Sequence, residues 1–243
     1  MTIDLKFTVA TISSTIEPQR TIWAAMHQDY SEEFVGAELD ERPDESKSGR
    51  LLIKHLLAGE RGHYGPLEHA QIVLAVGWFP HSVMQQARTH RIGVSFDVQS
   101  GRYTSKRIMD VALGKRDIED VFYLRPLGTY TDRKGDKYEY THDQRIIDVA
   151  RCYDAAGHYA YRIRQGMSEE HARDLVPYAI RQHFVVSFSL RALMHFLDLR
   201  AKRDAQLEIR QLCDLMRPAF EQWTPEIAEW YLSKRWGKAK LAP

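Results

Sequence analysis

The chain has 243 residues, and 44% of them are hydrophobic, so it is long enough to bury a sizeable core. The 34 lysines and arginines nearly balance the 33 aspartates and glutamates, which argues against a general nucleic-acid binder. No apolar run approaches the roughly 20 residues that cross a bilayer, so no membrane partner is expected.

Local patterns predict strands and helices in mixed order over the first half of the chain. Loosely alternating apolar residues predict a strand over 3–13, and a β-branched run predicts a strand over 70–78 that is buried on much of both faces. Residues 95–104 are predicted to form a strand or an extended loop. Apolar residues at helical spacing predict helices over 19–28, 48–58 and 81–91.

The second half of the chain is predicted to be mainly helical. The polar residues 114–137 are expected to form a surface loop, and residues 183–188 a strand. The clearest helix is predicted over 142–165, with an apolar stripe formed by Ile146, Ala150, Tyr153, Gly157 and Tyr161. Further helices are expected over 190–200, 204–222 and 225–236.

These elements indicate an α/β fold of the α+β type. We expect a central sheet that contains antiparallel strands and is flanked by helices, with residues 1–243 in a single domain. The sequence has no regular strand–helix–strand alternation and no GxGxxG motif, so a Rossmann unit is not expected. The isolated Cys152 and Cys213 favour a reducing, cytoplasmic environment and give no metal-ligand spacing.

The most informative segment is QQARTHRIGVSFDVQSGRYTSKR, residues 85–107. It interleaves arginines with serines and threonines, which are good donors to phosphate, and Gly101 permits close approach of the backbone to an anion. Composition alone leaves two interpretations open, a site for a phosphorylated small molecule and a solvated basic face. Gln86 and His90 share one face of the predicted helix with Val83, which indicates a lined cavity. A core histidine with satisfied hydrogen bonds is the alternative for His90.

The segment THRIGVSFDVQSGRY resembles the signature of the flavin-dependent thymidylate synthases, which reads Arg-His-Arg, seven residues, Ser and commonly Gly-Arg-Tyr. The matching residues are His90, Arg91, Ser100, Arg102 and Tyr103. Thr89 stands where the first arginine is usual. Eight residues separate Arg91 from Ser100, which we interpret as a one-residue loop insertion.

Three further segments extend the resemblance over most of the chain. GHYGPLEH matches at His63, Pro66, Glu68 and His69, and HARDLVP places Arg173. The last segment, SLRALMHFLDLRAKRDAQLEIR, keeps Arg191, Leu199, Arg200, Ala205, Gln206, Glu208 and Ile209. In the same segment Ser189, His195 and Asp204 replace the usual Asn, Asn and His.

Helical spacing gives independent information on Arg200. The predicted helix over 190–200 has a core stripe of Leu190, Leu193, Met194 and Leu197 and a separate polar face of Arg191, His195 and Asp198. Arg200 falls near Leu193, at the edge of the apolar stripe. A partly buried arginine needs a partner or a ligand, and an intramolecular salt bridge is the alternative to a ligand.

The resemblance implies a role for each matched residue. Arg200 is expected to be the catalytic residue, acting on the uracil ring of dUMP, where a cation stabilises charge as C5 becomes nucleophilic. The residues implied in dUMP binding are Gln86, Gln99, Ser100, Gly101, Arg102, Arg173 and Arg200. The residues implied on the FAD and folate side are His63, Glu68, His90, Arg91, Ile92, Ser189, Arg191 and His195.

The resemblance also implies the reaction and its co-reactants. The expected enzyme converts dUMP to dTMP without a cysteine nucleophile, with 5,10-methylenetetrahydrofolate as the carbon donor and NADPH as the reductant of FAD. A homotetramer that builds its sites at subunit interfaces is implied as well. Two other interpretations are a flavin- or folate-binding oxidoreductase with another substrate and a nucleic-acid-binding module built on residues 88–107.

Overall fold

The computed structural model describes residues 4–59, 62–132 and 134–238. The chain divides into two compact units, each built from segments that are distant in the sequence. Unit 1 comprises Met1–Thr8, Val76–Arg88 and Asp97–Phe184. Unit 2 comprises Val9–Ala75, Thr89–Phe96 and Val185–Pro243.

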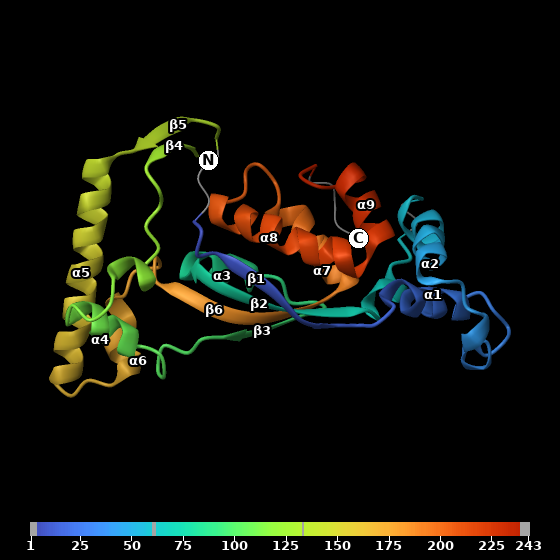
Figure 1. Cartoon of the computed structure of the whole chain (residues 1–243), viewed down its shortest axis with the longest axis horizontal. Coiled ribbons are helices and arrows are strands. Elements are labelled where there is room, and N and C mark those ends of the chain that lie inside the picture. Colours follow the sequence, from blue (N-terminus) through green and yellow to red (C-terminus); the bar gives the residue numbers. More distant parts are fainter. Residues whose placement is uncertain (1–3, 60–61, 133, 239–243) are drawn as a thin grey trace. The chain divides into compact units, whose positions relative to one another are not determined.

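Four strands form one sheet in the order β1, β2, β6, β3, as Figure 1 shows. Their bounds are Thr8–Ser14, Gln71–Pro80, Arg181–Ser189 and Val94–Val98. On β2 the alternate residues Ile72, Leu74 and Val76 are buried and the residues between them are partly buried, which agrees with the prediction of a strand buried on much of both faces. The sheet with helices beside it confirms the predicted α/β class.

The first strand begins later than its apolar alternation suggested. Asp4 organises a turn before it, because its carbonyl accepts from the backbone N–H of Phe7 at 3.1 Å and its carboxylate accepts from the backbone N–H of Lys6 at 2.9 Å. Phe7 is therefore outside the strand and instead stacks on Phe79, with ring centroids 4.0 Å apart. Residue 3, the first of the predicted strand, lies outside the described part of the chain.

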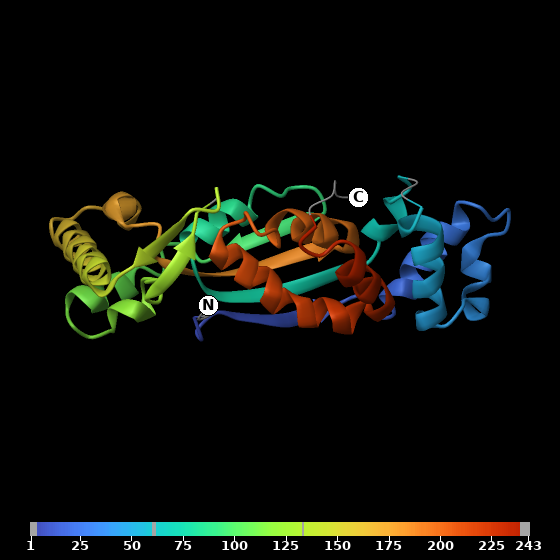
Figure 2. The same ribbon diagram turned by 90° about the horizontal axis from the view of Figure 1, so that it is seen from above.

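The helices of unit 2 fall close to their predicted positions. They are α1 Pro18–Gln28, α2 Glu45–Leu52, α7 Leu190–Arg200, α8 Leu207–Trp223 and α9 Pro225–Lys234. The first two lie side by side (Figure 2), and a π-helical turn over Ile53–Leu57 continues α2. The predicted core stripe of α7 is confirmed, since Leu190, Leu193, Met194 and Leu197 are all buried.

One residue of α7 lies on a different face from the predicted one. Asp198 was expected on the polar face with Arg191 and His195, but it is only 1% exposed. Its carboxylate accepts hydrogen bonds from the Tyr231 hydroxyl at 2.8 Å and from Arg235 Nη2 at 2.5 Å. Its partners are Tyr231 in α9 and Arg235 just after α9, so Asp198 belongs to a buried ionic contact and not to an exposed polar face.

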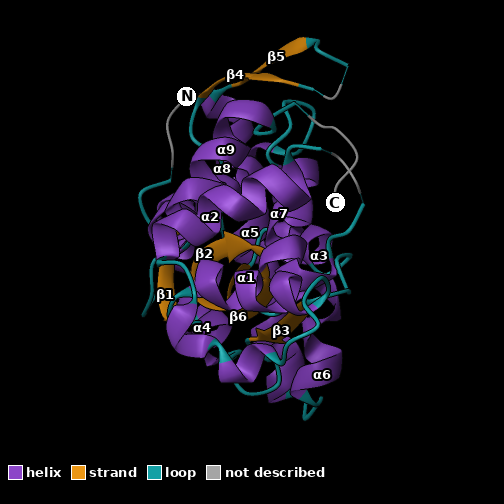
Figure 3. Cartoon of the chain, turned by 90° about the vertical axis from the view of Figure 1, so that its right-hand side faces the viewer, coloured by secondary structure: helices purple, strands orange, loops and turns teal. Residues whose placement is uncertain are grey.

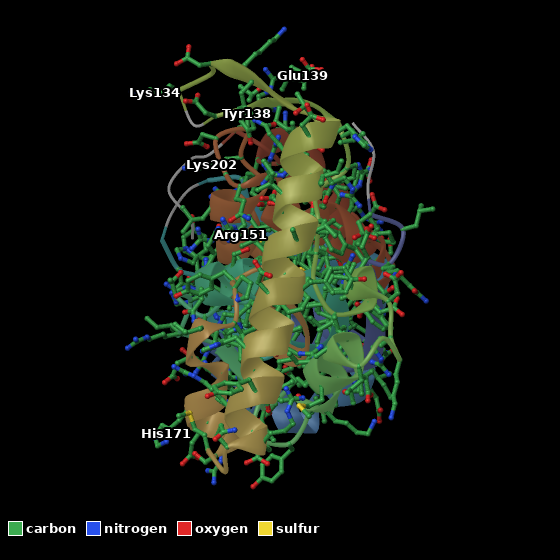
Figure 4. All side chains as sticks on the ribbon, turned by 90° about the vertical axis from the view of Figure 1, so that its left-hand side faces the viewer. Lys134, Tyr138, Glu139, Arg151, His171 and Lys202 are labelled. Atoms are coloured by element: carbon green, nitrogen blue, oxygen red, sulfur yellow. The ribbon has the colours of Figure 1, made fainter. Side chains whose placement is uncertain are left out.

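Unit 1 contains the remaining helices and a hairpin. They are α3 His81–Ala87, α4 Lys106–Ala112, α5 His142–Arg164, α6 Glu169–Ala172, β4 Gly128–Thr131 and β5 Lys137–Tyr140. The two short strands pair antiparallel and form the hairpin coloured orange at the top of Figure 3. Figure 4 shows this hairpin, with Tyr138 and Glu139, beside the N-terminal end of α5.

The prediction of a surface loop over 114–137 was wrong in two places, because the strand β4 lies within this segment and the stretch before β4 is buried. Ile118, Val121, Phe122 and Leu124 are buried, and they form one apolar cluster with residues of α4 and α5. Polar neighbours such as Lys115 and Arg116 dominate the local composition, although the apolar side chains among them point into the core. Composition averaged over the segment therefore concealed a core-forming stretch.

The predicted apolar stripe of α5 is largely exposed and does not form the buried face of the helix. Ile146, Tyr153 and Tyr161 are each about half exposed, at 54%, 46% and 54%. The buried face consists instead of Cys152, Ala156, Tyr159 and Ala160. Small residues on this face allow α4 and α5 to approach closely, and Thr141 starts the helix through a capping box with Gln144.

Within the described residues, no helix combines the length and the apolar character that crossing a membrane requires.

Candidate functional site

The predicted site residues divide between the two units. Unit 1 contains Gln86, Gln99, Ser100, Gly101, Arg102 and Arg173. Unit 2 contains His63, Glu68, His90, Arg91, Ile92, Ser189, Arg191, His195 and Arg200. The dUMP set, apart from Arg200, is therefore assembled in one unit, and the FAD and folate set in the other.

The loop 99–105 is fixed at both ends by hydrogen bonds within unit 1. The backbone N–H of Gln99 donates to the carbonyl of His183 at 2.9 Å, directly after β3. The Ser100 carbonyl accepts from the backbone N–H and from the hydroxyl of Thr104, at 3.1 and 2.8 Å, which closes a tight turn. Gln99 Oε1 is buried and has no hydrogen-bond partner among the described residues, so a donor on a ligand would satisfy it.

Gly101 and Arg173 meet at this turn. A Cβ atom on residue 101 would lie 3.0 Å from Nη1 and 3.2 Å from Cδ of Arg173, so the glycine allows the guanidinium to lie against the loop. Arg102, the next residue, pairs through Nε with Glu170 Oε2 of α6 at 3.0 Å. The Arg102 and Glu170 side chains are 59% and 41% exposed, so solvent screens this pair and an anion can compete for the arginine.

The helix that was expected to align Gln86 with His90 is shorter than predicted. It ends at Ala87, where the Arg88 backbone N–H donates to the Met84 carbonyl at 3.0 Å. Gln86 and His90 therefore do not share a helical face, and that argument for a lined cavity was wrong. His90 is nevertheless buried, at 7% exposure, and packs against Phe196 of α7 with ring centroids 4.9 Å apart.

Arg200 is held by the segment that follows α3. Its Nε donates to His90 Nε2 at 3.0 Å, and its Nη2 donates to the Thr89 hydroxyl oxygen at 2.7 Å. Both acceptors are neutral, so these contacts orient the guanidinium without cancelling its positive charge. Burial lowers the pKa of Arg200, which shows that its charge lies in a partly desolvated place, where it acts more strongly than in water.

The contact with Arg200 requires a neutral His90. Burial, the charge of Arg200 and the proximity of His195 together lower the pKa of His90 from 6.5 to about 4. At neutral pH the imidazole is therefore uncharged, and its Nε2 lone pair accepts the hydrogen bond from Arg200. The same arrangement fixes the tautomer with the proton on Nδ1.

Glu68 joins two other predicted residues. Its carboxylate accepts a short hydrogen bond from the Ser189 hydroxyl and lies 3.5 Å from Nη1 of Arg191. Ser189 also caps α7 by accepting from the Ala192 backbone N–H at 3.2 Å. Glu68 thus has an arginine partner within the chain.

Four residues of the FAD and folate set remain, namely His63, Arg91, Ile92 and His195. His63 pairs through Nε2 with Asp29 Oδ2 at 2.8 Å. Arg91 is exposed, and the apolar Ile92 is 84% exposed. His195 packs edge-on against His90, with ring centroids 5.3 Å apart.

These residues suit the flavin that the resemblance implies. Arg91 and Arg191 offer cationic donors for a diphosphate, and Ile92 presents apolar surface to solvent that a planar ring would cover. Ser189 and Glu68 add a hydroxyl and a carboxylate in direct contact with each other. The donor set therefore fits FAD chemically.

Sequence reasoning missed three residues of the site. Thr89 was noted only as a departure from the family pattern, yet it contacts Arg200. Glu170 lies outside the matched segments, yet it pairs with Arg102. Gly93 has a φ of 67°, and a Cβ there would lie 2.6 Å from Ser189 Oγ and 2.9 Å from Glu68 Oε2. The sequence signal that could have identified Gly93 is its position two residues after Arg91.

Comparison with known proteins identifies the family of the chain. The model of the family described as thymidylate synthase complementing protein matches residues 11–226. A flavin-dependent thymidylate synthase of Haloarcula marismortui is 34% identical over 251 residues, which cover 97% of this chain and 99% of that protein. One of Halobacterium salinarum is 31% identical over 249 residues, again covering 97% and 99%.

Solved structures show the same fold. The UMP/dUMP methylase PolB from Streptomyces cacaoi, crystallised with 5-Br UMP, superposes with a TM-score of 0.72 at 20% identity and covers 98% of this chain and 96% of its own. Its structure with 5-Br dUMP gives a TM-score of 0.71 at 23% identity, with 94% and 96% covered. With the family model matching residues 11–226, the chain belongs to the thymidylate synthase complementing protein family, the flavin-dependent thymidylate synthases.

Proposed function

We propose that the chain converts dUMP to dTMP as a flavin-dependent thymidylate synthase, with FAD as its cofactor and 5,10-methylenetetrahydrofolate as carbon donor. Family membership supports the reaction. The observation that carries the mechanism is the Arg200 guanidinium, oriented by the neutral acceptors His90 and Thr89.

In this mechanism Arg200 stabilises negative charge on the pyrimidine. Its guanidinium faces charge that develops on the uracil carbonyls as C5 becomes nucleophilic, and its partly desolvated position strengthens that interaction. Arg173 and Arg102 bind the phosphate, with the Ser100 hydroxyl and the backbone at Gly101 as further donors. When bound, FAD supplies the hydride that completes the methyl group, and NADPH is the proposed source of that hydride.

Both thiols are poorly suited to nucleophilic catalysis. Cys152 and Cys213 are free and buried. Burial raises the pKa of Cys152 to about 11 and also raises the pKa of Cys213, so both remain protonated at neutral pH. This state supports a route without a thiolate, and free thiols also support the proposed cytoplasmic location.

We further propose that the enzyme works as a homotetramer with FAD at subunit interfaces. Large apolar side chains exposed on the single chain support association. Among them are Ile92, which is one of the predicted site residues, and Tyr103, which follows Arg102; each is 84% exposed.

The decisive experiment combines flavin spectroscopy with product analysis. The purified protein is expected to be yellow, to bleach with NADPH under anaerobic conditions, and to form dTMP when dUMP and methylenetetrahydrofolate are added. The variant Cys152→Ser/Cys213→Ser is expected to form dTMP as well. A flavin-loaded double variant that binds dUMP yet makes no dTMP would restore a cysteine nucleophile and overturn the proposed route.

A further inference from the structure

Thr89 makes one of the contacts that orient the Arg200 guanidinium. Thr89 follows the end of α3, and its side chain is exposed. Its hydroxyl oxygen accepts from Arg200 Nη2 at 2.7 Å, while the adjacent His90 accepts from Arg200 Nε at 3.0 Å. Two consecutive residues thus hold two different nitrogens of one guanidinium.

The chemistry of a guanidinium makes such acceptors necessary. Arginine carries five N–H donors in a rigid plane and no acceptor, so only acceptor groups can fix its orientation by hydrogen bonds. A single contact at Nε leaves the plane able to swing about the axis of that bond. The contact of Nη2 with Thr89 restricts this rotation and so helps to set the direction of the guanidinium plane.

The identity of residue 89 matters for this reason. An arginine, which the family signature usually has here, would present only donors and a second positive charge to Arg200. Threonine presents an acceptor without charge. The replacement of the usual arginine by Thr89 therefore matches the contact that Arg200 makes at this position.

We propose that Thr89 is a positioning residue for Arg200, which fixes the plane of the guanidinium for its action on the pyrimidine. This inference rests on the proposed catalytic role of Arg200. Because positioning affects the transition state more than the bound substrate, the loss of Thr89 should lower kcat and leave the KM for dUMP nearly unchanged.

The test compares a variant that lacks the hydroxyl group with a variant that keeps it. Thr89→Val keeps the shape and removes the acceptor, and it is expected to lower kcat for dTMP formation about 10-fold, the scale of one lost hydrogen bond to a charged group. Thr89→Ser keeps the acceptor and is expected to restore most of the rate. Calorimetric binding of dUMP should be the same for both variants within about 2-fold.

Two reference variants show whether the effect passes through Arg200. Arg200→Ala sets the rate without the guanidinium, and Thr89→Val/Arg200→Ala is expected to be no slower than Arg200→Ala alone. Multiplicative losses in the double variant would overturn the positioning role, as would equal rates for Thr89→Val and wild type. If Arg200→Ala itself forms dTMP at the wild-type rate, the catalytic role of Arg200 is wrong and the inference about Thr89 ends with it.

Discussion

Arg102, which we propose binds the phosphate, is paired with the carboxylate of Glu170. Its 3.0 Å contact with Glu170 is exposed, so a phosphate dianion with Arg173 close by is a stronger partner. We expect Arg102→Ala and Arg173→Ala each to weaken dUMP binding by about 1.5–3 kcal/mol, as charge-assisted contacts are lost. Glu170→Gln should strengthen it slightly, by up to about 1 kcal/mol, because Arg102 is released.

Titration calorimetry with dUMP measures these changes directly. Arg151→Ala is the matched control, since Arg151 is 77% exposed on α5 and belongs to a different ion pair, with Asp154. FAD content should stay constant throughout the series. A variant that loses flavin but keeps its dUMP affinity would mean that these arginines bind the flavin and not the phosphate of dUMP.

His90 gives the folded chain a specific dependence on acid. The pKa of His90 is about 4 in the folded chain and 6.5 in its ordinary state. Between these values the unfolded chain binds a proton here and the folded chain does not, so the free energy of unfolding falls as pH drops from 6.5 towards 4. Protonation also removes the acceptor that Arg200 uses.

The variant His90→Gln separates this effect from other titrations. Glutamine keeps an acceptor oxygen but does not titrate, so its melting temperature should fall less steeply with acid than that of the wild type. His81 and His183, whose pKa values are also lowered by burial, are present in both proteins and cancel in the comparison. Parallel curves over pH 4 to 6.5 would show that His90 does not carry the effect.

At the scale of elements, a buried ion pair joins α7 to the residue that follows α9. Asp198 is 1% exposed, and Arg235, which is 7% exposed, contacts both of its carboxylate oxygens. Asp198→Ala removes the carboxylate that compensates the charge of this buried arginine, which costs about 3–5 kcal/mol. The free energy of unfolding should fall by that amount in chemical denaturation.

The control for this change is an exposed pair on α8. Arg217 and Glu221 lie 2.9 Å apart with side chains 49% and 42% exposed, so Glu221→Ala should cost no more than about 1 kcal/mol. Similar losses for Asp198→Ala and Glu221→Ala would mean that burial adds nothing to the α7 contact.

The same pair shows what helical periodicity can and cannot predict. The apolar stripe of α7 was predictable, because burial of a helix follows a period that the sequence displays. The burial of Asp198 was not, because it depends on Arg235, which lies far along the chain and reaches it only in the folded protein. For α5 the periodic residues were visible, but the choice of the buried face depended on the small residues Ala156 and Ala160.

The candidate site divides in a similar way. Motif resemblance identified Arg200, His90 and Glu68, because short sequence patterns record residue identity. The contacts that these residues make were not predictable. The Thr89 hydroxyl, for example, reaches Arg200 only because the segment after α3 packs against α7. The failed argument from Gln86 and His90 has the same origin, a helix end that local sequence did not fix.

At the scale of the whole molecule, the exposed apolar surface of one chain requires an explanation. Ile92 and Tyr103 are each 84% exposed, and Ile147 on α5 is 58% exposed. Soluble monomers rarely leave large apolar patches in water, and association would cover them. We expect light scattering at micromolar concentration to give four times the 28.3 kDa mass of the chain.

Assembly and flavin binding should then depend on each other. If FAD binds at subunit interfaces, it stabilises the tetramer by mass action, and dilution should release flavin and dissociate the tetramer over the same concentration range. Recording flavin fluorescence and scattered mass on one dilution series tests this coupling. Added FAD should shift both transitions to lower protein concentration. A monomer that keeps its FAD and its full rate of dTMP formation would place the whole site within one chain and contradict the shared-site assembly.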